Sequence, residues 1–185
     1  MLNIRYYAGI DPDLRKLSYA IVNSRGQLVR VQLAKINDKD LKGLPLVERA
    51  CRKAAHLGSD VSLAFTAAAI EMPDVTYTGR TNAARRQDLV LLAAVAGAWK
   101  GSIPNSHLTL PFDWKGTVPK HIPQCRAYRD LGIEYELWGG QHKYAVPKLP
   151  KEVIVSDGIN PGDWADVSDS VALALWCYRK FGGGE

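Results

Sequence analysis

Residues 4–36 read IRYYAGIDPDLRKLSYAIVNSRGQLVRVQLAKI, and this stretch predicts the beginning of a β-sheet. Two turn signals, DPD and SRG, divide it into three apolar runs, the first of which is apolar enough for a central strand. The third run alternates apolar and polar residues, as a strand with one buried face does. The pattern therefore predicts an antiparallel meander with strands at residues 4–10, 17–23 and 28–36.

Helical and strand patterns alternate along the rest of the chain. A helix over 45–57 should end at Gly58, and in the best helical pattern, 81–99, Gly97-Ala98 predicts close packing against the sheet. Residues 134–160 are rich in glycine, proline and aromatic residues and form a candidate insertion without an assigned element. The remaining expected elements are strands at 63–70 and 107–111 and helices at 119–131 and 163–181.

This order of elements predicts a single α/β domain over residues 1–185. Its mixed central sheet should combine the antiparallel three-strand meander with parallel strands, and helices should flank it. Hydrophobic residues make up 46% of the chain and charged residues 23%, which is ordinary globular composition and excludes a disordered chain.

Composition also limits which binding partners and which cellular compartment we expect for this protein. Three cysteines without a CxxC pair fit a reducing environment, and no apolar run reaches the roughly 18 residues that a membrane helix needs. The N-terminal residues lack the apolar segment of a signal peptide, so we expect a cytoplasmic protein with no membrane partner. The net charge of +5 and pI of about 9.1 permit a nucleic-acid partner.

Four carboxylates stand where apolar elements end or turn polar. Asp11 follows the first predicted strand, and Glu71 follows the apolar run at 63–70. Asp166 and Asp169 are three residues apart on the last helix, so their Cβ atoms should lie about 5–6 Å apart on one face. Like charges at that distance repel unless a cation lies between them.

Each of these acids also has a purely structural explanation. Asp11 belongs to a turn signal, and Glu71 could be a solvated strand end. Aspartates at the start of a helix are stabilised by its dipole, which explains Asp163 as an N-cap but explains Asp169, further along the helix, poorly. The functional interpretation rests on the combination of the four residues.

That combination resembles a known family. The motif GIDPD with its following hairpin, AIE about 60 residues later, and the late helix DVSDSVALALW are similar to the RuvC-type Holliday junction resolvases, within the ribonuclease H-like superfamily. The late helix looks especially like that of phage-encoded members. The resemblance covers the order of elements over most of the chain, whereas literal motif identity is confined to these short stretches.

The resemblance implies a metal-dependent endodeoxyribonuclease with a ribonuclease H-like fold. Asp11, Glu71, Asp166 and Asp169 would be its catalytic residues and metal ligands, holding two Mg2+ or Mn2+ ions. It further implies a homodimer that cleaves opposed strands of a four-way DNA junction, in the cytoplasm of the host bacterium if the chain is phage-encoded. Hard oxygen ligands suit these cations, and two of them can grip the attacking and departing oxygens of a phosphodiester.

The chain departs from the family pattern in the loop after Glu71. Many members carry an aromatic residue three positions after this glutamate, whereas here the position is Asp74, and Tyr77 is the nearest aromatic candidate for stacking. Basic residues mixed with aromatic ones suit contacts to DNA phosphates. The predicted DNA-binding residues are Tyr77, Arg80, Arg85, Arg86, Lys115 and Lys120.

Two other functions stay open at the level of sequence. One is a different ribonuclease H-like nuclease, acting on RNA–DNA hybrids or flaps, and the other is a non-catalytic module that binds branched DNA. A sugar-kinase-like ATPase has less support, because a second phosphate loop and an adenosine loop are missing from the sequence.

Overall fold

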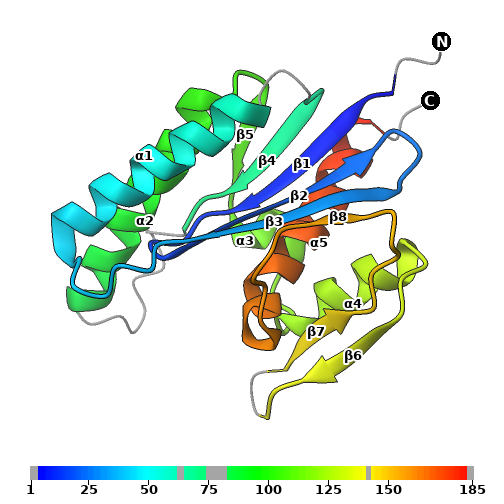
Figure 1. The fold of residues 1–185 in the computed structure, drawn as a ribbon. Coiled ribbons are helices and arrows are strands. Elements are labelled where there is room, and N and C mark those ends of the chain that lie inside the picture. The colour runs from blue at the N-terminus through cyan, green and yellow to red at the C-terminus, as the bar shows by residue number, and fades with distance from the viewer. Residues whose placement is uncertain (1–3, 62–64, 74–82, 141–142, 183–185) are drawn as a thin grey trace.

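The computed structural model describes residues 4–61, 65–73, 83–140 and 143–182, with the side chains at positions 61 and 83–87 outside this description. A six-stranded sheet in the order β5-β4-β1-β2-β3-β8 forms its centre (Figure 1). Strands β1, β2 and β3 pair antiparallel, whereas β4 on β1, β5 on β4 and β8 on β3 pair parallel. The strands are β1 (Tyr6–Asp11), β2 (Lys16–Asn23), β3 (Leu28–Lys35), β4 (Ala67–Glu71), β5 (Ser106–Thr109) and β8 (Ile154–Val155).

Helices cover both faces of the sheet (Figure 1). Helices α1 and α2 pack on one face, and α5 packs against β1 and β2 on the other. Helix α4 and a two-stranded hairpin of β6 and β7 contact α5 on its outer side. These elements are α1 (Gly43–Val61), α2 (Ala83–Ser102), α3 (Pro111–Lys115), α4 (His121–Asp130), β6 (Tyr135–Trp138), β7 (Tyr144–Pro147) and α5 (Trp164–Phe181).

This architecture confirms the predicted α/β class and the mixed sheet flanked by helices. Within the candidate insertion at 134–160, the structure forms the hairpin β6–β7 and the short edge strand β8. Helix α3 had no counterpart in the sequence prediction. No helix in the described part of the chain combines the length and the hydropathy needed to cross a bilayer.

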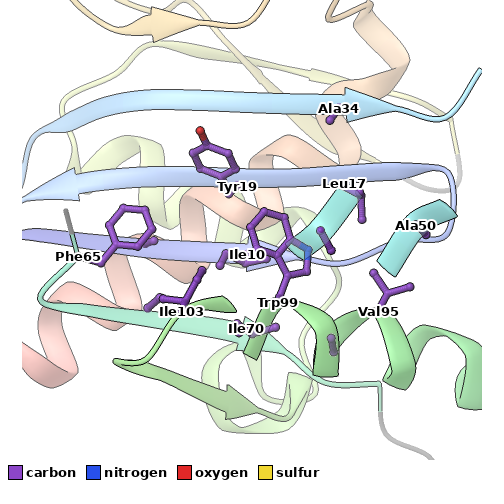
Figure 2. Close-up of a cluster of buried hydrophobic side chains, with 14 of the residues drawn as sticks. Ile10, Leu17, Tyr19, Ala34, Ala50, Phe65, Ile70, Val95, Trp99 and Ile103 are labelled. Atoms are coloured by element: carbon purple, nitrogen blue, oxygen red, sulfur yellow. The ribbon is translucent and has the colours of Figure 1, made fainter. Parts of the chain in front are cut away.

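Side chains of β1 alternate between two separate cores. Ala8 and Ile10 pack into the cluster between the sheet and helices α1 and α2, where Trp99 is fully buried (Figure 2). Tyr7 points to the opposite face and packs with Leu173 of α5. Successive strand residues face opposite sides, so β1 is buried on both faces and reads as a nearly continuous apolar run.

The same alternation holds in the neighbouring strand β4. Ala68 and Ile70 join the α1–α2 core, whereas Ala67 and Ala69 join the core on the α5 face. The final residue, Glu71, continues the second series and therefore falls on the α5 face.

Helices α1 and α2 correct two expectations about glycine. Gly58 lies inside α1, which continues to Val61. A Cβ at position 58 would overlap the Ser102 side chain of α2. Gly58 therefore marks a close helix–helix approach and not a helix end. A Cβ at Gly97 would meet no atom within 4 Å, so the predicted close packing of Gly97 on the sheet is wrong.

Gly9 of β1 faces the backbone of α5. A Cβ at this position would overlap backbone atoms of Ser170 and Ala174, and backbone cannot move aside as the end of a flexible side chain can. Only glycine fits this contact.

We predict that Gly9→Ala lowers the free energy of unfolding by about 3 kcal/mol or more, because overpacking here displaces a whole helix. Gly97→Ala is the matched control and should leave stability unchanged or raise it by up to about 1 kcal/mol, since it adds a good helix former in open space. Chemical denaturation of the two variants measures both effects. Equal stability of Gly9→Ala and the parent chain would contradict the close contact.

Candidate active site

Asp11 and Glu71 end two neighbouring parallel strands. The register pairs Ile10 of β1 with Ile70 of β4, so the next residue of each strand, Asp11 and Glu71, lies at the same edge of the sheet. Both side chains fall on the α5 face, as the alternation along each strand requires. The two predicted strand-end carboxylates are therefore brought together.

Helix α5 supplies the other two carboxylates from its first half. Asp169 is 3% exposed, whereas the Asp166 side chain is 29% exposed. All four carboxylates line one pocket of about 250 Å3. Lys115 and Lys120, both predicted to contact phosphates, line the same pocket.

The two lysines that line the pocket pair with these carboxylates, and Lys16 Nζ lies 3.5 Å from Asp166 Oδ2 as well. Lys115 Nζ lies 3.3 Å from both carboxylate oxygens of Glu71, and Trp114 Nε1 donates a hydrogen bond to Glu71 Oε2 at 2.8 Å. Lys120 Nζ lies 2.9 Å from Asp169 Oδ2 and 3.5 Å from Asp166 Oδ1. The short helix α3 thus places a cation beside Glu71, and the residue before α4 places one beside Asp166 and Asp169.

Burial and mutual repulsion act on the acids in the pocket. Burial raises the pKa of Asp11 well above its ordinary value, and the nearby charges of Glu71 and Asp169 raise it further. Burial also raises the pKa of Glu71, against the opposing effect of Lys115. Burial alone would lower the pKa of Lys120, but the attraction of Asp169 and Asp11 outweighs it and raises that pKa.

The donor set fits a hard divalent cation by its chemistry. Carboxylate oxygens are the ligands that Mg2+ and Mn2+ prefer, and a cation would relieve the repulsion that raises the pKa of Asp11. Glu71, Asp166 and Asp169 pair with lysines, and among the described residues no three His, Cys, Asp or Glu side chains are arranged to hold one ion. Asp11, Glu71, Asp166 and Asp169 are the residues that would hold it.

Gln124 is a site residue that the sequence analysis missed. Its side chain is fully buried, and Nε2 donates to Asp169 Oδ1 at 2.7 Å and to the Ala165 carbonyl at 3.0 Å. Its Oε1 accepts the backbone N–H of Ala145 in β7 at 2.9 Å. Gln124 therefore fixes the orientation of the Asp169 carboxylate and connects it to the β6–β7 hairpin. A lone glutamine in a helix carries no local signal of such a role.

The side chain of Asp163 pairs with two lysines and is not among the described residues that line the carboxylate pocket. It stands at the N-cap position of α5, but its side chain makes no cap hydrogen bond. Instead it lies 2.6 Å from Lys35 Nζ and 3.1 Å from Lys16 Nζ, and it accepts the backbone N–H of Asn160. Asp163 therefore anchors the start of α5 to the ends of β2 and β3.

The predicted DNA-binding residues after Glu71 are not all described. Tyr77 and Arg80 lie outside the described residues. Arg85 and Arg86 lie in the first turn of α2, and their side chains are outside the description. Their contacts with DNA stay a prediction.

Comparison with solved structures places this fold among known ones. A mixed sheet in the order β5-β4-β1-β2-β3-β8, with α1 and α2 on one face and α5 on the other, is the topology of a ribonuclease H-like fold. The chain is similar to Thermus thermophilus RuvC, with 16% sequence identity and a TM-score of 0.53 over 96% of each chain. A structure of T. thermophilus RuvC in complex with Holliday junction substrate gives 18% identity and a TM-score of 0.55, again over 96% of each chain.

At these low identities the structural likeness shows the fold alone, and the chemistry must be argued from the residues of the pocket. A scan against protein-family models finds no match, and a search of curated proteins finds none either.

We predict that Gln124→Ala lowers the free energy of unfolding by about 2–4 kcal/mol, because Asp169 Oδ1 and the Ala145 N–H lose a buried partner. Gln124→Met, which nearly keeps the volume without the hydrogen bonds, separates bonding from packing and should still cost about 1–3 kcal/mol. Urea denaturation measures both variants. Wild-type stability of Gln124→Met would show that the hydrogen bonds stabilise nothing.

We predict that Asp163 contributes stability that depends on pH. Burial would raise its pKa, but hydrogen bonds from Lys35, from the Asn160 N–H and from Lys16 outweigh burial and lower the pKa. A group with a lowered folded-state pKa stabilises the fold above its unfolded value, about 3.9, and loses that contribution as the pH falls further.

The Asp163→Asn variant should therefore be less stable than the parent by about 1–3 kcal/mol at neutral pH, and the difference should shrink as the pH falls below about 4. Unfolding measured across this pH range tests the prediction. In a Lys35→Met background the neutral-pH difference should be smaller, because the partner at 2.6 Å is gone. A difference that grows on acidification would contradict the assignment.

Proposed function

We propose that this chain is a metal-dependent endonuclease that resolves four-way DNA junctions. The observation that carries the proposal is the single pocket in which carboxylates from β1, β4 and α5 meet two lysines. Support also comes from the fold, which is similar to that of T. thermophilus RuvC, a protein whose structure is known with Holliday junction substrate. The sequence motifs around Asp11, Glu71 and the late helix agree with this proposal.

The residues of the pocket divide into two roles. Asp11, Glu71, Asp166 and Asp169 are proposed to hold two Mg2+ or Mn2+ ions, which when bound supply an activated water and stabilise the departing oxygen. Lys115 and Lys120 are proposed to contact the phosphates on either side of the cleaved bond, since both line the pocket with their ammonium groups.

Hydrogen bonds from neighbouring side chains hold two of the carboxylates in place. Trp114 orients Glu71 by its indole hydrogen bond, and Gln124 orients Asp169. A carboxylate fixed in this way pays less rotational entropy when it coordinates an ion. No described serine, cysteine or histidine lines the pocket, so we propose water as the nucleophile.

The symmetry of the proposed substrate, a four-way junction, suggests that the protein acts as a homodimer. A four-way junction has two-fold symmetry, and a symmetric homodimer would present one carboxylate pocket to each of two opposed strands. The likeness of DVSDSVALALW to phage-encoded resolvases supports a phage origin, and with it action in the cytoplasm of a bacterial host.

The proposal is tested by incubating the protein with labelled four-way junctions, flaps, RNA–DNA hybrids and linear duplex of matched sequence. We expect Mg2+-dependent paired nicks in the junction, little cutting of the other substrates, and no cutting with a chelator. Preferential cutting of hybrids or flaps would redirect the assignment to another nuclease. Junction binding that is equal with Mg2+ and with chelator, and without any nicking, would indicate a binding module.

Variants in the pocket should separate cutting from binding. Asp11→Asn and Glu71→Gln should lower the cutting rate by more than about a hundredfold, because each removes a proposed ligand, while junction binding is retained. Asp60→Asn, an exposed carboxylate on α1, is the matched control and should cut at the parent rate. Full cutting by Asp11→Asn would count directly against the proposed centre.

A further inference from the structure

A second pocket adjoins the carboxylate pocket and is lined by cations and aromatic rings. It has a volume of about 190 Å3 and lies between α3, α4 and α5. The residues that define it are Trp114, Lys115, Pro123, Arg126, Trp176 and Arg179. We call it the basic pocket.

The basic pocket borders the carboxylate pocket at two residues of α3. Lys115 lines both pockets. Trp114 forms a wall of the basic pocket while its indole nitrogen is bonded to Glu71 of the carboxylate pocket. Lys115 Nζ lies 4.8 Å from the centre of the Trp114 ring. The two pockets therefore lie next to each other, with Lys115 between them.

The charges of the two pockets are opposite. Among the described residues, three cations and no acid line the basic pocket, whereas four of the residues that line its neighbour are the site carboxylates. Arg179 is held by Asp130 at 2.8 Å, and Lys115 is held by Glu71. Arg126 is exposed, and the structure gives it no ion pair or hydrogen bond with the described residues. Its guanidinium is therefore available to an anion from outside the chain.

The walls of the basic pocket are apolar. Ala127, Ala172 and Leu175 form a small buried cluster against which Trp114 packs. Lys180 Nζ lies 4.5 Å from the centre of the Trp176 ring, which adds a further positive charge beside this wall. A cationic rim over an aromatic and aliphatic wall suits a sugar–phosphate unit, because the phosphate can bind the rim while the sugar or base lies on the wall.

We propose that the basic pocket binds a backbone phosphate of the cleaved DNA strand, close to the scissile bond, and that Arg126 is the residue that contacts it. This subsite rests on the proposed nuclease function and extends it, because it gives the direction in which the strand leaves the carboxylates. The strand would pass Lys115 and continue over the pocket that α3, α4 and α5 border. A guanidinium at the rim binds a phosphate bidentately, which fixes the strand more firmly than a point charge would.

The test measures junction binding by fluorescence anisotropy in an Asp11→Asn background with chelator, so that no strand is cut. Arg126→Ala should weaken binding about threefold to tenfold, and the slope of log affinity against log salt should become shallower by about 1. Arg126→Glu should weaken binding more, and Arg126→Lys should restore part of the affinity with the original slope. Arg49→Ala, an exposed arginine on α1 across the sheet, is the control and should bind as the parent does.

Ethylation interference locates the contact along the strand. With the parent protein, ethylation of a phosphate within about two nucleotides of the cut should block binding, and Arg126→Ala should lose the interference at that one phosphate. Arg126 is exposed, so thermal unfolding of the variants should match the parent, which separates a lost contact from a damaged fold.

The possible failures of the two proposals differ. If the parent protein neither binds nor cuts junctions, the nuclease proposal falls and the subsite falls with it. If the parent binds and cuts, but Arg126→Ala and Arg126→Glu keep the parent's affinity, salt slope and interference pattern, the nuclease proposal stands and the subsite is overturned. Interference lost only far from the cut would also overturn it.

Discussion

At Gly9 the backbone of β1 lies directly against the backbone of α5, and the placement of the acidic pocket depends on this contact. Any side chain at position 9 would overlap Ser170 and Ala174. Asp11 is two residues along the strand on the same face, and Asp166 and Asp169 lie just before the contact on the helix. A buried contact between the hydroxyls of Ser18 and Ser170, at 2.7 Å, holds the helix to β2 beside it. Loss of this close approach would move two carboxylates away from the other two.

The close placement of the buried acids destabilises their ionised forms, and other segments of the chain offset this destabilisation. The raised pKa of Asp11 records it: burial and the charges of Glu71 and Asp169 all disfavour its ionised form. Most of the compensating groups come from the segment between β5 and β6, where Lys115 and Lys120 supply charge and Gln124 supplies a hydrogen bond, and Lys16 of β2 adds a charge beside Asp166. The sheet and α5 therefore provide the carboxylates, and the intervening segment makes their burial tolerable. A pocket in which some segments supply buried charges and others compensate them is typical of a functional site, where stability is lost in return for a specific charge arrangement.

Site residues could be predicted from sequence where a local pattern marks them, but not where their role depends on a partner far away along the chain. Asp11 and Glu71 could be found because apolar runs end at them, and Asp166 and Asp169 because a three-residue spacing puts two side chains on one helix face. The partners could not: Gln124 reaches Asp169 across 45 residues, Trp114 reaches Glu71 across 43, and Lys16 reaches Asp166 across 150. Glycine shows the same limit, since Gly58 and Gly97 look alike locally and only the partner helix shows that one is packed and the other open.

Pairing of the lysines with the carboxylates agrees with the proposed function when the charges are considered together. Without a divalent cation, four crowded carboxylates need positive partners, and Lys115 and Lys120 are the cations that line the pocket. If divalent cations take over the carboxylates, the same ammonium groups lose their partners where a phosphodiester would lie. Binding of the anionic substrate would then restore their pairing, so the cations and the substrate would each favour the binding of the other. In the proposed substrate complex each ammonium would thus exchange a carboxylate for a phosphate.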